Sequence, residues 1–358
     1  MALQHRNLEP TNVDIIVGID GGQVSLPLIS FMIRFKFMPF KGMLKVTCQI
    51  TEKPTINEIG PSSSKRIRFE EGYGRDDFRD SSVHKVLLLA IATDLQENHH
   101  NLNIIISKLK LNSLVYSLSE DIKVMLQMVG KQSASCKHPC PYCEAESPLQ
   151  FGVHFNANTL GSLDENHKSW EKAGANPLQA KQFQNVTKPS LLTGSLETKV
   201  IEKLNIPGLH IILGVTDKLL KEMEINLFKT KEDGFRWLSD YLKTINLKRV
   251  CYQGQHRLEG NNCMHFLKKV DNLQRAFESD PDLTLPGLKY VKVFRSFYAV
   301  IESCFGKTLD LDYRLKIEAF CKDYEDIGAS VTLKVHILEI HVPEFIQMKG
   351  ESFGKSFN

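Results

Sequence analysis

Two short segments of the chain carry the residue types of a zinc site. Cys140 and Cys143 lie in the segment CPYC near the middle of the 358 residues, and His336 and His341 lie near the end. Two thiolates and two imidazoles are the ligand set of a closed, tetrahedral, structural zinc site. His336 stands 193 positions beyond Cys143 (336 − 143). If the two pairs meet, one ion ties together the two ends of a large insertion.

Two aspartates are candidate ligands for a different kind of metal. Asp20 follows an alternating apolar run and precedes two glycines, and Asp121 follows a second short apolar run. Carboxylates at adjacent strand ends of a mixed sheet can share a hard cation such as Mg²⁺. Each aspartate also has a plain structural interpretation, because Asp20 could open a glycine turn and Asp121 could cap the following helix. The order of the motifs along the chain favours the metal interpretation, since Asp121 stands 19 positions before Cys140, the first cysteine of the zinc motif (140 − 121).

The CPYC segment allows two other interpretations. A CxxC pair at a helix start can have a depressed thiol pKa and serve in redox chemistry. The pair of distant histidines and the absence of a thioredoxin-like order of elements argue against it. A local knuckle could use Cys136, His138, Cys140 and Cys143, but four ligands within eight positions leave little chain to wrap a tetrahedron. The neighbouring His99 and His100 are expected to be solvent-exposed.

The composition is that of an ordinary globular chain with a large core, with 42% hydrophobic and 24% charged residues. A formal net charge of +3 is too small to indicate a nucleic-acid partner by itself. Eight cysteines and no charged-then-apolar leader at the start predict reduced thiols in an intracellular protein. Four of these cysteines fall in apolar helical stretches and are expected to be buried: Cys251, Cys263, Cys304 and Cys321.

The N-terminal third is expected to be rich in strands and the remainder helical. Strands are expected at Val13–Ile19, Leu44–Ile50, Val86–Ala92 and 114–118, with a helix over 94–108 capped at Thr93 or Asp94. Residues 144–193 are the most loop-like part. Apolar residues at three- and four-residue spacing predict further helices over 122–130, 194–204, 216–227, 231–245, 260–277, 290–305 and 311–327.

The apolar stretch Val24–Gly42 is out of place in this scheme. Arg34 and Lys36 interrupt it, and its two prolines would break a spanning helix, so no membrane span is expected. It separates the strand that leads to Asp20 from the strand expected at Leu44–Ile50, and those two would otherwise form a hairpin. We therefore expect Val24–Gly42 to be an insertion extruded from the sheet.

The order of these motifs resembles one known family. It is similar to the catalytic core of the recombination-activating V(D)J recombinase of vertebrate immunity and its transposase relatives in invertebrates. The resemblance rests on GIDGG around Asp20, SEDIKVMLQMVG around Asp121, HPCPYC, and KVHILEIHVPEFI, and it extends over nearly the whole chain from Val13. LEGNN at 258–262 and LHIILG at 209–214 are similar to two further motifs of the insertion.

This resemblance implies an α/β plus α fold: a ribonuclease-H-like mixed sheet with a large zinc-tied helical insertion. Residues 1–135 would form the sheet region, with 24–42 inserted, residues 136–345 the zinc-binding helical insertion, and residues 346–358 a truncated tail. Asp20 and Asp121 would hold Mg²⁺ or Mn²⁺, and Cys140, Cys143, His336 and His341 would hold Zn²⁺. The family's third carboxylate would fall beyond Asn358, so the sheet is expected to be incomplete. Glu344 and Glu351 are expected to be surface glutamates.

The implied activity is phosphoryl transfer on double-stranded DNA in the nucleus, without a covalent protein intermediate. The partners would be DNA, contacted through its phosphates, and a second copy of the chain. With two carboxylates the second metal is underligated, and the chain as given is expected not to cut DNA. Lys123, Lys131 and Lys137 are expected to be solvated lysines near the site. The alternative is a zinc-stabilised DNA-binding or interaction protein without catalysis.

Overall fold

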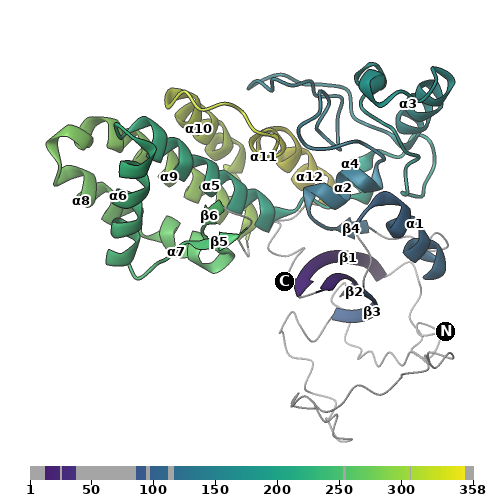
Figure 1. Ribbon diagram of the computed structural model, residues 1–358, viewed down its shortest axis with the longest axis horizontal. Helices are drawn as coiled ribbons and strands as arrows, with labels where there is room; N and C mark the ends of the chain where they lie inside the picture. Colours follow the sequence, from purple (N-terminus) through teal and green to yellow (C-terminus); the bar gives the residue numbers. More distant parts are fainter. Residues whose placement is uncertain are drawn as a thin grey trace, which may run out of the picture.

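The computed structural model is a mixed α/β protein that is mostly helical (Figure 1). It describes residues 97–111, 117–252, 255–306 and 308–350, together with the backbone of three strands, β1 (Val13–Val24), β2 (Leu26–Phe37) and β3 (Val86–Thr93). The strands lie at one end of the molecule beneath two short helices, and most of the helices extend away from them (Figure 1).

The main sheet has four strands in the order β3-β2-β1-β4, where β4 is Ser117–Ser119. The pairs β1–β2 and β2–β3 are antiparallel, whereas β1 and β4 are parallel. Ser117, Leu118 and Ser119 lie opposite Ile16, Val17 and Gly18 in that parallel pair. The sheet is therefore of mixed direction, and its two strands that lead toward Asp20 and Asp121 are neighbours.

The expectation that Val24–Gly42 is extruded from the sheet is wrong over Leu26–Phe37. This segment is the central strand β2, which pairs with β1 on one side and β3 on the other. The physical signal is the period of two: apolar residues recur at every second position from Ile29 to Phe37, which is the strand repeat. The proline at 27 sits at the start of the strand, where a missing N–H costs little. The expected strand Leu44–Ile50 lies outside the described residues.

Short helices lie between the sheet and the large helical part, and the loop between α2 and α3 carries Cys140 and Cys143. Helix α1 begins later than expected, because the side chain of Asn98 caps it by accepting a hydrogen bond from Asn101 N at 3.0 Å. The region expected to be loop contains a helix whose N-terminus is formed by a capping box of Thr159 and Ser162. The elements are α1 (His99–Lys108), α2 (Ile122–Met128), α3 (Leu160–Lys172), a 3₁₀-helix (Pro177–Phe183) and α4 (Val200–Lys203).

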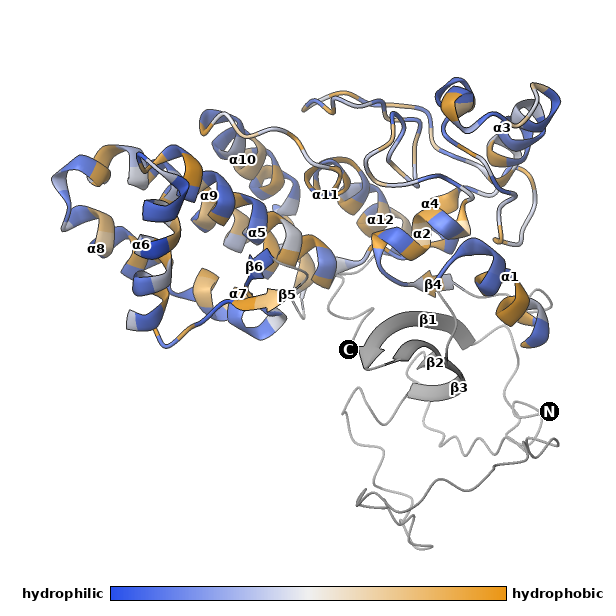
Figure 2. Ribbon diagram, viewed as in Figure 1, coloured by the Kyte–Doolittle hydropathy of each residue, from blue (hydrophilic) through white to orange (hydrophobic). Residues whose placement is uncertain are grey.

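The larger helical part packs around α5 and the 25-residue helix α9. Its helices carry apolar residues on one side and polar residues on the other, and the apolar sides form one core (Figure 2). The helix expected over 260–277 is two helices that meet at Lys269. The elements are α5 (Gly208–Asn226), α6 (Lys231–Thr244), the hairpin β5 (Val250–Tyr252) and β6 (Gln255–Arg257), α7 (Gly260–Lys268), α8 (Val270–Glu278), α9 (Pro281–Phe305) and α10 (Tyr313–Asp326).

The chain then returns toward α2 through a continuous helical segment in three parts. These are α11 (Leu333–His336), a π-helical turn (Ile337–His341) and α12 (Val342–Lys349). Figure 1 shows α11 and α12 between the helical part and α2. This return places residues near position 340 beside the CPYC segment. None of the helices described has the length and apolar character that a bilayer crossing requires.

Candidate metal centre

The four predicted zinc ligands converge in the structure. Cys140 Sγ lies 3.4 Å from His341 Nε2, and Cys143 Sγ lies 3.3 Å from His336 Nε2. One ligand atom from each of the four residues lies within 4.8 Å of the other three, and all four side chains are buried. Metal–ligand distances of roughly 2.0–2.3 Å in a tetrahedron require separations of this size. The cluster is therefore fitted to hold a metal ion such as zinc.

The histidine pair depends on the π-helical turn. In a regular α-helix, residues five apart point about 140° away from each other, so His336 and His341 could not face one ion. The wider turn over Ile337–His341 brings both rings to one side, with their centroids 5.3 Å apart. Pro343 has no N–H to donate back to the preceding turn, which favours the break in the regular α-helical hydrogen bonds at this point.

The loop that carries the cysteines is held by Asn158. Its buried side-chain nitrogen donates to the carbonyl oxygens of Cys140, Pro141 and Cys143, at 3.3, 2.9 and 3.0 Å. Lys131, which is also buried, donates from Nζ to Cys140 O at 2.7 Å. Four carbonyl contacts from two side chains satisfy the loop backbone where water is excluded. They set the directions of the two thiol groups.

Replacing Asn158 with aspartate is expected to weaken metal binding without disturbing the shape of the core. The two side chains have the same size, but a carboxylate cannot donate to the three carbonyl oxygens and would be repelled by them. Outer contacts of this kind are worth about 10- to 100-fold in metal affinity. Zinc affinity measured by competition with a chromophoric chelator checks this. Asn166→Asp, at a half-buried position of α3 outside the cluster, is the matched control and should bind zinc as the wild type does.

A carboxylate orients one of the two histidines. Glu344 Oε2 lies 3.0 Å from His341 Nδ1, on the side of the ring away from the thiols. This contact is the usual outer support of a metal-bound imidazole, because it fixes which nitrogen faces the metal. The expectation that Glu344 is only a surface glutamate is wrong, since its carboxylate is partly buried against His341. Glu351 lies outside the described residues.

The buried thiols differ in how readily they ionise. Burial acts to raise the pKa of Cys140, but a hydrogen bond with Cys143 and the nearby Lys131 ammonium outweigh it, so the pKa lies below its usual value. The hydrogen bond with Cys140, together with burial, raises the pKa of Cys143 to about 11. The first proton therefore leaves Cys140. A bound metal ion would take both as thiolates and displace the second proton.

The local knuckle is not what the structure forms. His138 Nδ1 lies 3.3 Å from Glu144 O, and neither His138 nor Cys136 belongs to the four-residue cluster. Of the four cysteines expected to be buried, Cys263, Cys304 and Cys321 are buried and Cys251 is exposed. Cys251 lies in the outer hairpin strand β5, which leaves its side chain on the surface.

Asp20 lies within β1, whereas Asp121 lies two residues beyond the neighbouring strand β4, at the start of α2. Asp121 caps α2, with Oδ1 accepting a hydrogen bond from Val124 N at 2.8 Å, so the capping interpretation is confirmed. The interpretation that Asp20 opens a glycine turn is wrong. The strand β1 continues through Asp20 and both glycines to Val24, and Asp20 lies opposite Ser30 of β2. The separation of the two carboxylates lies outside the described side chains.

Glu120 is a buried acid that the sequence did not single out. Only 5% of it is exposed, and within the part of the chain that the structure describes neither of its carboxyl oxygens has a hydrogen-bond partner. Burial raises its pKa well above the usual value, and the charges of Asp121 and Glu97 add to this effect. A carboxyl group in such a place favours its protonated form. The sequence feature that could have indicated a buried acid here is the position of Glu120 directly after the strand β4.

Glu120→Gln is expected to become more stabilising, relative to wild type, as pH rises. Because folding raises the Glu120 pKa, this group's contribution to stability is fully present below its unfolded pKa of about 4.3 and is lost as pH rises through the folded pKa. Glutamine cannot ionise and escapes that loss, which is on the order of 1–3 kcal/mol for an unpartnered buried group. Melting temperatures of both proteins between pH 5 and 8 test this. A difference that does not change with pH would contradict it.

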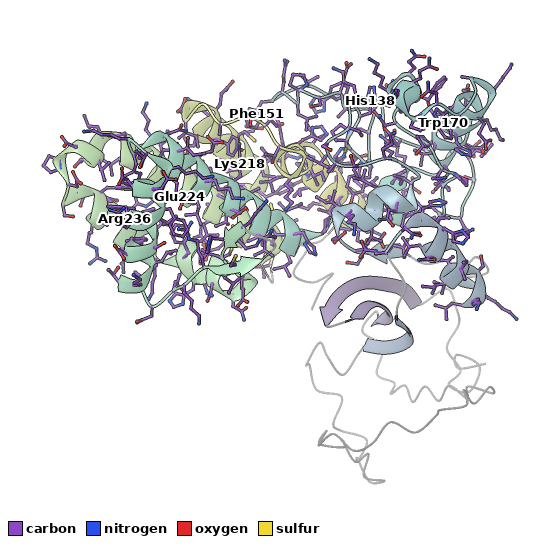
Figure 3. All side chains as sticks on the ribbon, in the orientation of Figure 1. His138, Phe151, Trp170, Lys218, Glu224 and Arg236 are labelled. Atoms are coloured by element: carbon purple, nitrogen blue, oxygen red, sulfur yellow. The ribbon has the colours of Figure 1, made fainter. Side chains whose placement is uncertain are left out.

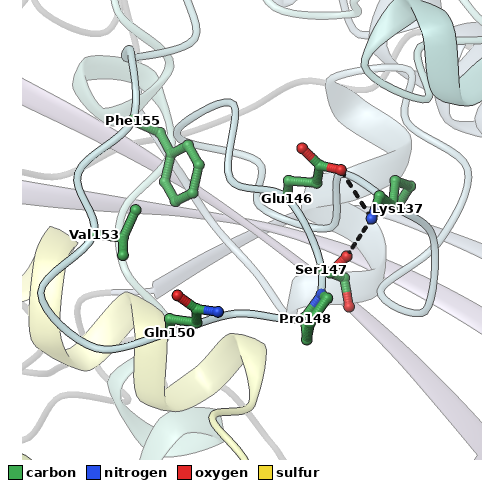
Figure 4. Close-up of a pocket in the computed structure, with 7 residues that line it drawn as sticks. All are labelled: Lys137, Glu146, Ser147, Pro148, Gln150, Val153 and Phe155. Carbon is green, nitrogen blue, oxygen red and sulfur yellow. Dashed lines mark hydrogen bonds and ion pairs between the residues drawn. The ribbon is translucent and has the colours of Figure 1, made fainter.

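Of the three lysines expected to be solvated, Lys123 and Lys137 are exposed, as expected, although each forms an ion pair, whereas the expectation is wrong for Lys131. Lys123 Nζ lies 2.7 Å from Glu97 Oε1, and Lys131 is buried as described above. Lys137 Nζ lies 2.8 Å from Glu146 Oε1 and donates to Ser147 O at 2.7 Å, at the edge of a pocket of about 220 Å³ (Figure 4). Lys137 is therefore already paired with Glu146, and these are the two charged side chains among the described residues that line this pocket.

A family model matches part of the chain. A family described as a domain of unknown function (DUF8703) matches residues 79–176, and no curated protein matches the chain. The matched region includes Asp121 and the two cysteines of the cluster but ends well before His336 and His341. The metal cluster therefore joins the matched region to a segment beyond it.

Proposed function

We propose that this chain is the core of a DNA-processing protein of the transposase and recombinase type. In this proposal Asp20 and Asp121 bind a divalent cation at the edge of a ribonuclease-H-like sheet. The zinc ion held by Cys140, Cys143, His336 and His341 closes a large helical insertion. Double-stranded DNA is the substrate, two copies of the chain act on two DNA ends, and the nucleus is the compartment.

One observation carries the proposal: the register of the parallel pair β1–β4. Gly18 lies opposite Ser119, the last residue of β4. Asp20 and Asp121 each lie two positions further along the chain, so a continuation of this register would bring them to the same level. Two aspartates at one level of adjacent parallel strands are suited to share a hard cation. The strand order β3-β2-β1-β4, with three antiparallel strands and a parallel fourth, is also the order in which a ribonuclease-H-like sheet begins.

Asp121 can bind a cation while it caps α2. Only its Oδ1 is used by Val124 N, and within the described residues its Oδ2 accepts no hydrogen bond. The backbone of α2 thereby fixes the direction of the free oxygen. A bound Mg²⁺ or Mn²⁺ would supply a polarised phosphoryl oxygen and an activated attacking group. Asp20 and Asp121 would hold that cation, and the rigid β1–β4 pair would set their spacing.

The runner-up is a zinc-stabilised DNA-binding or interaction protein without catalysis. The capping bond of Asp121 favours it, because capping alone gives this aspartate a structural role. The two functions differ in one measurable property, since only the first requires a divalent cation between β1 and β4. Both retain the buried metal cluster.

The test uses two substitutions that separate capping from cation binding. Asp121→Asn keeps the cap, because asparagine caps as well as aspartate, but removes the charge. Asp121→Ala removes both and should cost about 1 kcal/mol of stability. Fe²⁺ substituted for Mg²⁺, with ascorbate and peroxide, cleaves a backbone close to the bound ion. Cleavage near residues 20 and 121 in the wild type and in neither variant, with and without duplex DNA, is the expected result.

Two other outcomes decide against parts of this proposal. Cleavage that persists equally in Asp121→Asn places the iron elsewhere and removes Asp121 from the cation site. Specific binding of duplex DNA with no divalent-ion cleavage in β1 or β4 favours the non-catalytic alternative.

A further inference from the structure

A pocket of about 660 Å³ is lined by residues from Ile122 onward, the residue that follows Asp121 in the chain. One wall is α2, from Ile122 to Gln127, and the opposite walls are the middle of α5 and the start of α11. This volume falls within the range of small-molecule and cofactor sites, about 300–1,000 Å³. The position is distinct from the zinc cluster and from the smaller pocket at Lys137.

The lining combines an apolar surface with positive charge. Ile122, Leu126 and Leu333 supply the apolar part, whereas Lys123 and Lys334 supply two ammonium groups. None of the described residues that line the pocket is acidic. A concave site with cations and no carboxylate favours an anion, and its apolar surface gives room for the flat, uncharged part of the same ligand.

Lys334 is the cation most available to a ligand. Among the described residues it forms no ion pair or hydrogen bond, and the acids whose charge acts on it are Asp217 and Asp121. Asp217 already pairs with Lys221 at 2.8 Å. Lys123, by comparison, is paired with Glu97. An ammonium group has three donors, so Lys334 retains its full capacity for an incoming anion.

Gly214 is what lets Lys334 lie in the pocket. The glycine stands in the middle of α5, and the lysine side chain runs across it. A methyl group at position 214 would overlap the outer carbons and the nitrogen of that side chain. Glycine in a helix interior costs roughly 1 kcal/mol relative to alanine, so its presence here has a compensating use. The space left by the missing side chain of Gly214 thus holds the Lys334 side chain, and both residues line the pocket.

We propose that this pocket binds one nucleotide of the DNA, with Lys334 neutralising its phosphate and Ile122, Leu126 and Leu333 contacting the sugar and base. The proposal rests on the proposed function, and it adds where the strand next to the cation site is held. Its contact with phosphate positions the strand and does not read its sequence.

The experiment compares four full-length proteins by fluorescence anisotropy with a labelled DNA duplex, over a range of salt concentrations. Lys334→Met removes the charge and keeps the length of the side chain. Gly214→Ala keeps every charge but displaces Lys334, whose flexible end can move aside without unfolding α5. Lys172→Met removes an exposed lysine at the end of α3, outside the pocket. Melting temperatures establish that each variant is folded, and a 5′-mononucleotide serves as the second ligand.

Lys334→Met and Gly214→Ala should each bind the duplex about ten-fold more weakly than wild type, the loss of one charged hydrogen bond. For Lys334→Met the slope of log affinity against log salt should fall by about 0.9, the value for one phosphate contact. Lys172→Met should change neither quantity. If Lys334→Met and Lys172→Met weaken binding equally and Gly214→Ala does not, the effect is one of overall charge. That result would overturn the proposal that this pocket binds a nucleotide.

The remaining outcomes separate this proposal from the proposed function. If wild type binds DNA and Lys334→Met binds it equally well, the assignment of the pocket as a nucleotide site is wrong and the DNA-processing function stands. If wild type binds the mononucleotide through Lys334 but does not bind DNA, the DNA assignments of both the pocket and the protein fail. If wild type binds neither ligand, both proposals fail.

Discussion

Cys143→Ser is expected to remove the bound zinc and to lower the melting temperature by roughly 10–20 °C. A hydroxyl group is a poor zinc ligand, and the three remaining residues would leave the ion under-coordinated. The cluster joins segments 193 positions apart, so its loss frees a long loop. Structural zinc contributes about 10–16 kcal/mol in small zinc peptides, which is comparable to the whole stability of a typical domain. Zinc content per chain and thermal unfolding by circular dichroism measure both effects.

Two cysteine variants serve as controls for this result. Cys263 is buried, and its Sγ lies 3.8 Å from Leu258 O, outside the four-residue cluster, so Cys263→Ser tests the loss of a buried thiol away from the metal. Cys136→Ser lies four positions before Cys140 and tests the local knuckle. Both should keep one zinc ion per chain. A Cys143→Ser protein with the zinc content of the Cys263→Ser protein would contradict the site.

Glu224→Leu is expected to destabilise the helical part by about 3–5 kcal/mol. Glu224 lies on α5 (Figure 3) and pairs with Arg249, at 2.5 Å, with 7% and 6% of the two side chains exposed. Arg249 also donates to Ser239 Oγ on α6 at 3.0 Å and lies 4.3 Å from the ring centre of Phe235. Removing the carboxylate leaves a buried guanidinium without its counter-charge, which is far more costly than losing an exposed pair. Chemical denaturation measures the change.

The matched control is the exposed pair of Asp240 and Lys243, at 2.8 Å, of which 63% and 74% are exposed. Asp240→Asn should cost under about 1 kcal/mol. The double variant Glu224→Leu with Arg249→Met should recover much of the loss, because both buried charges are then gone. Similar small costs for Glu224→Leu and Asp240→Asn would show that the ion pair does not hold α5 to α6.

The metal ligands could be predicted from the sequence because residue type and spacing alone specify them. Their environment could not be predicted in this way. Asn158 and Lys131 are polar residues whose importance depends on three carbonyl groups that approach only after folding. The π-helical turn between His336 and His341 is a local departure from the periodicity on which helix prediction depends. These features reflect tertiary contacts, which a single sequence does not display.

The sheet was harder to predict than the helices, for a physical reason. Strand pairing joins distant segments, and a short apolar run such as Leu26–Phe37 can be read as a strand or as an insertion. Its alternation of residue types was a valid signal that its high overall hydrophobicity obscured. The helices α6 and α10 were predicted nearly to their ends, because each has a regular apolar stripe and begins at an Asp or Thr N-cap.

X-ray absorption at the zinc edge of the purified, full-length protein tests the central claim most directly, because it counts the sulfur and nitrogen ligands of the bound ion. Two sulfur atoms at about 2.3 Å and two nitrogen atoms at about 2.0–2.1 Å are expected, from Cys140, Cys143, His336 and His341. The His341→Ala protein should lose one nitrogen ligand or the ion itself. Three sulfur atoms and one nitrogen atom, unchanged in His341→Ala, would mean a local knuckle through Cys136 and His138, and would contradict the joining of the two distant segments.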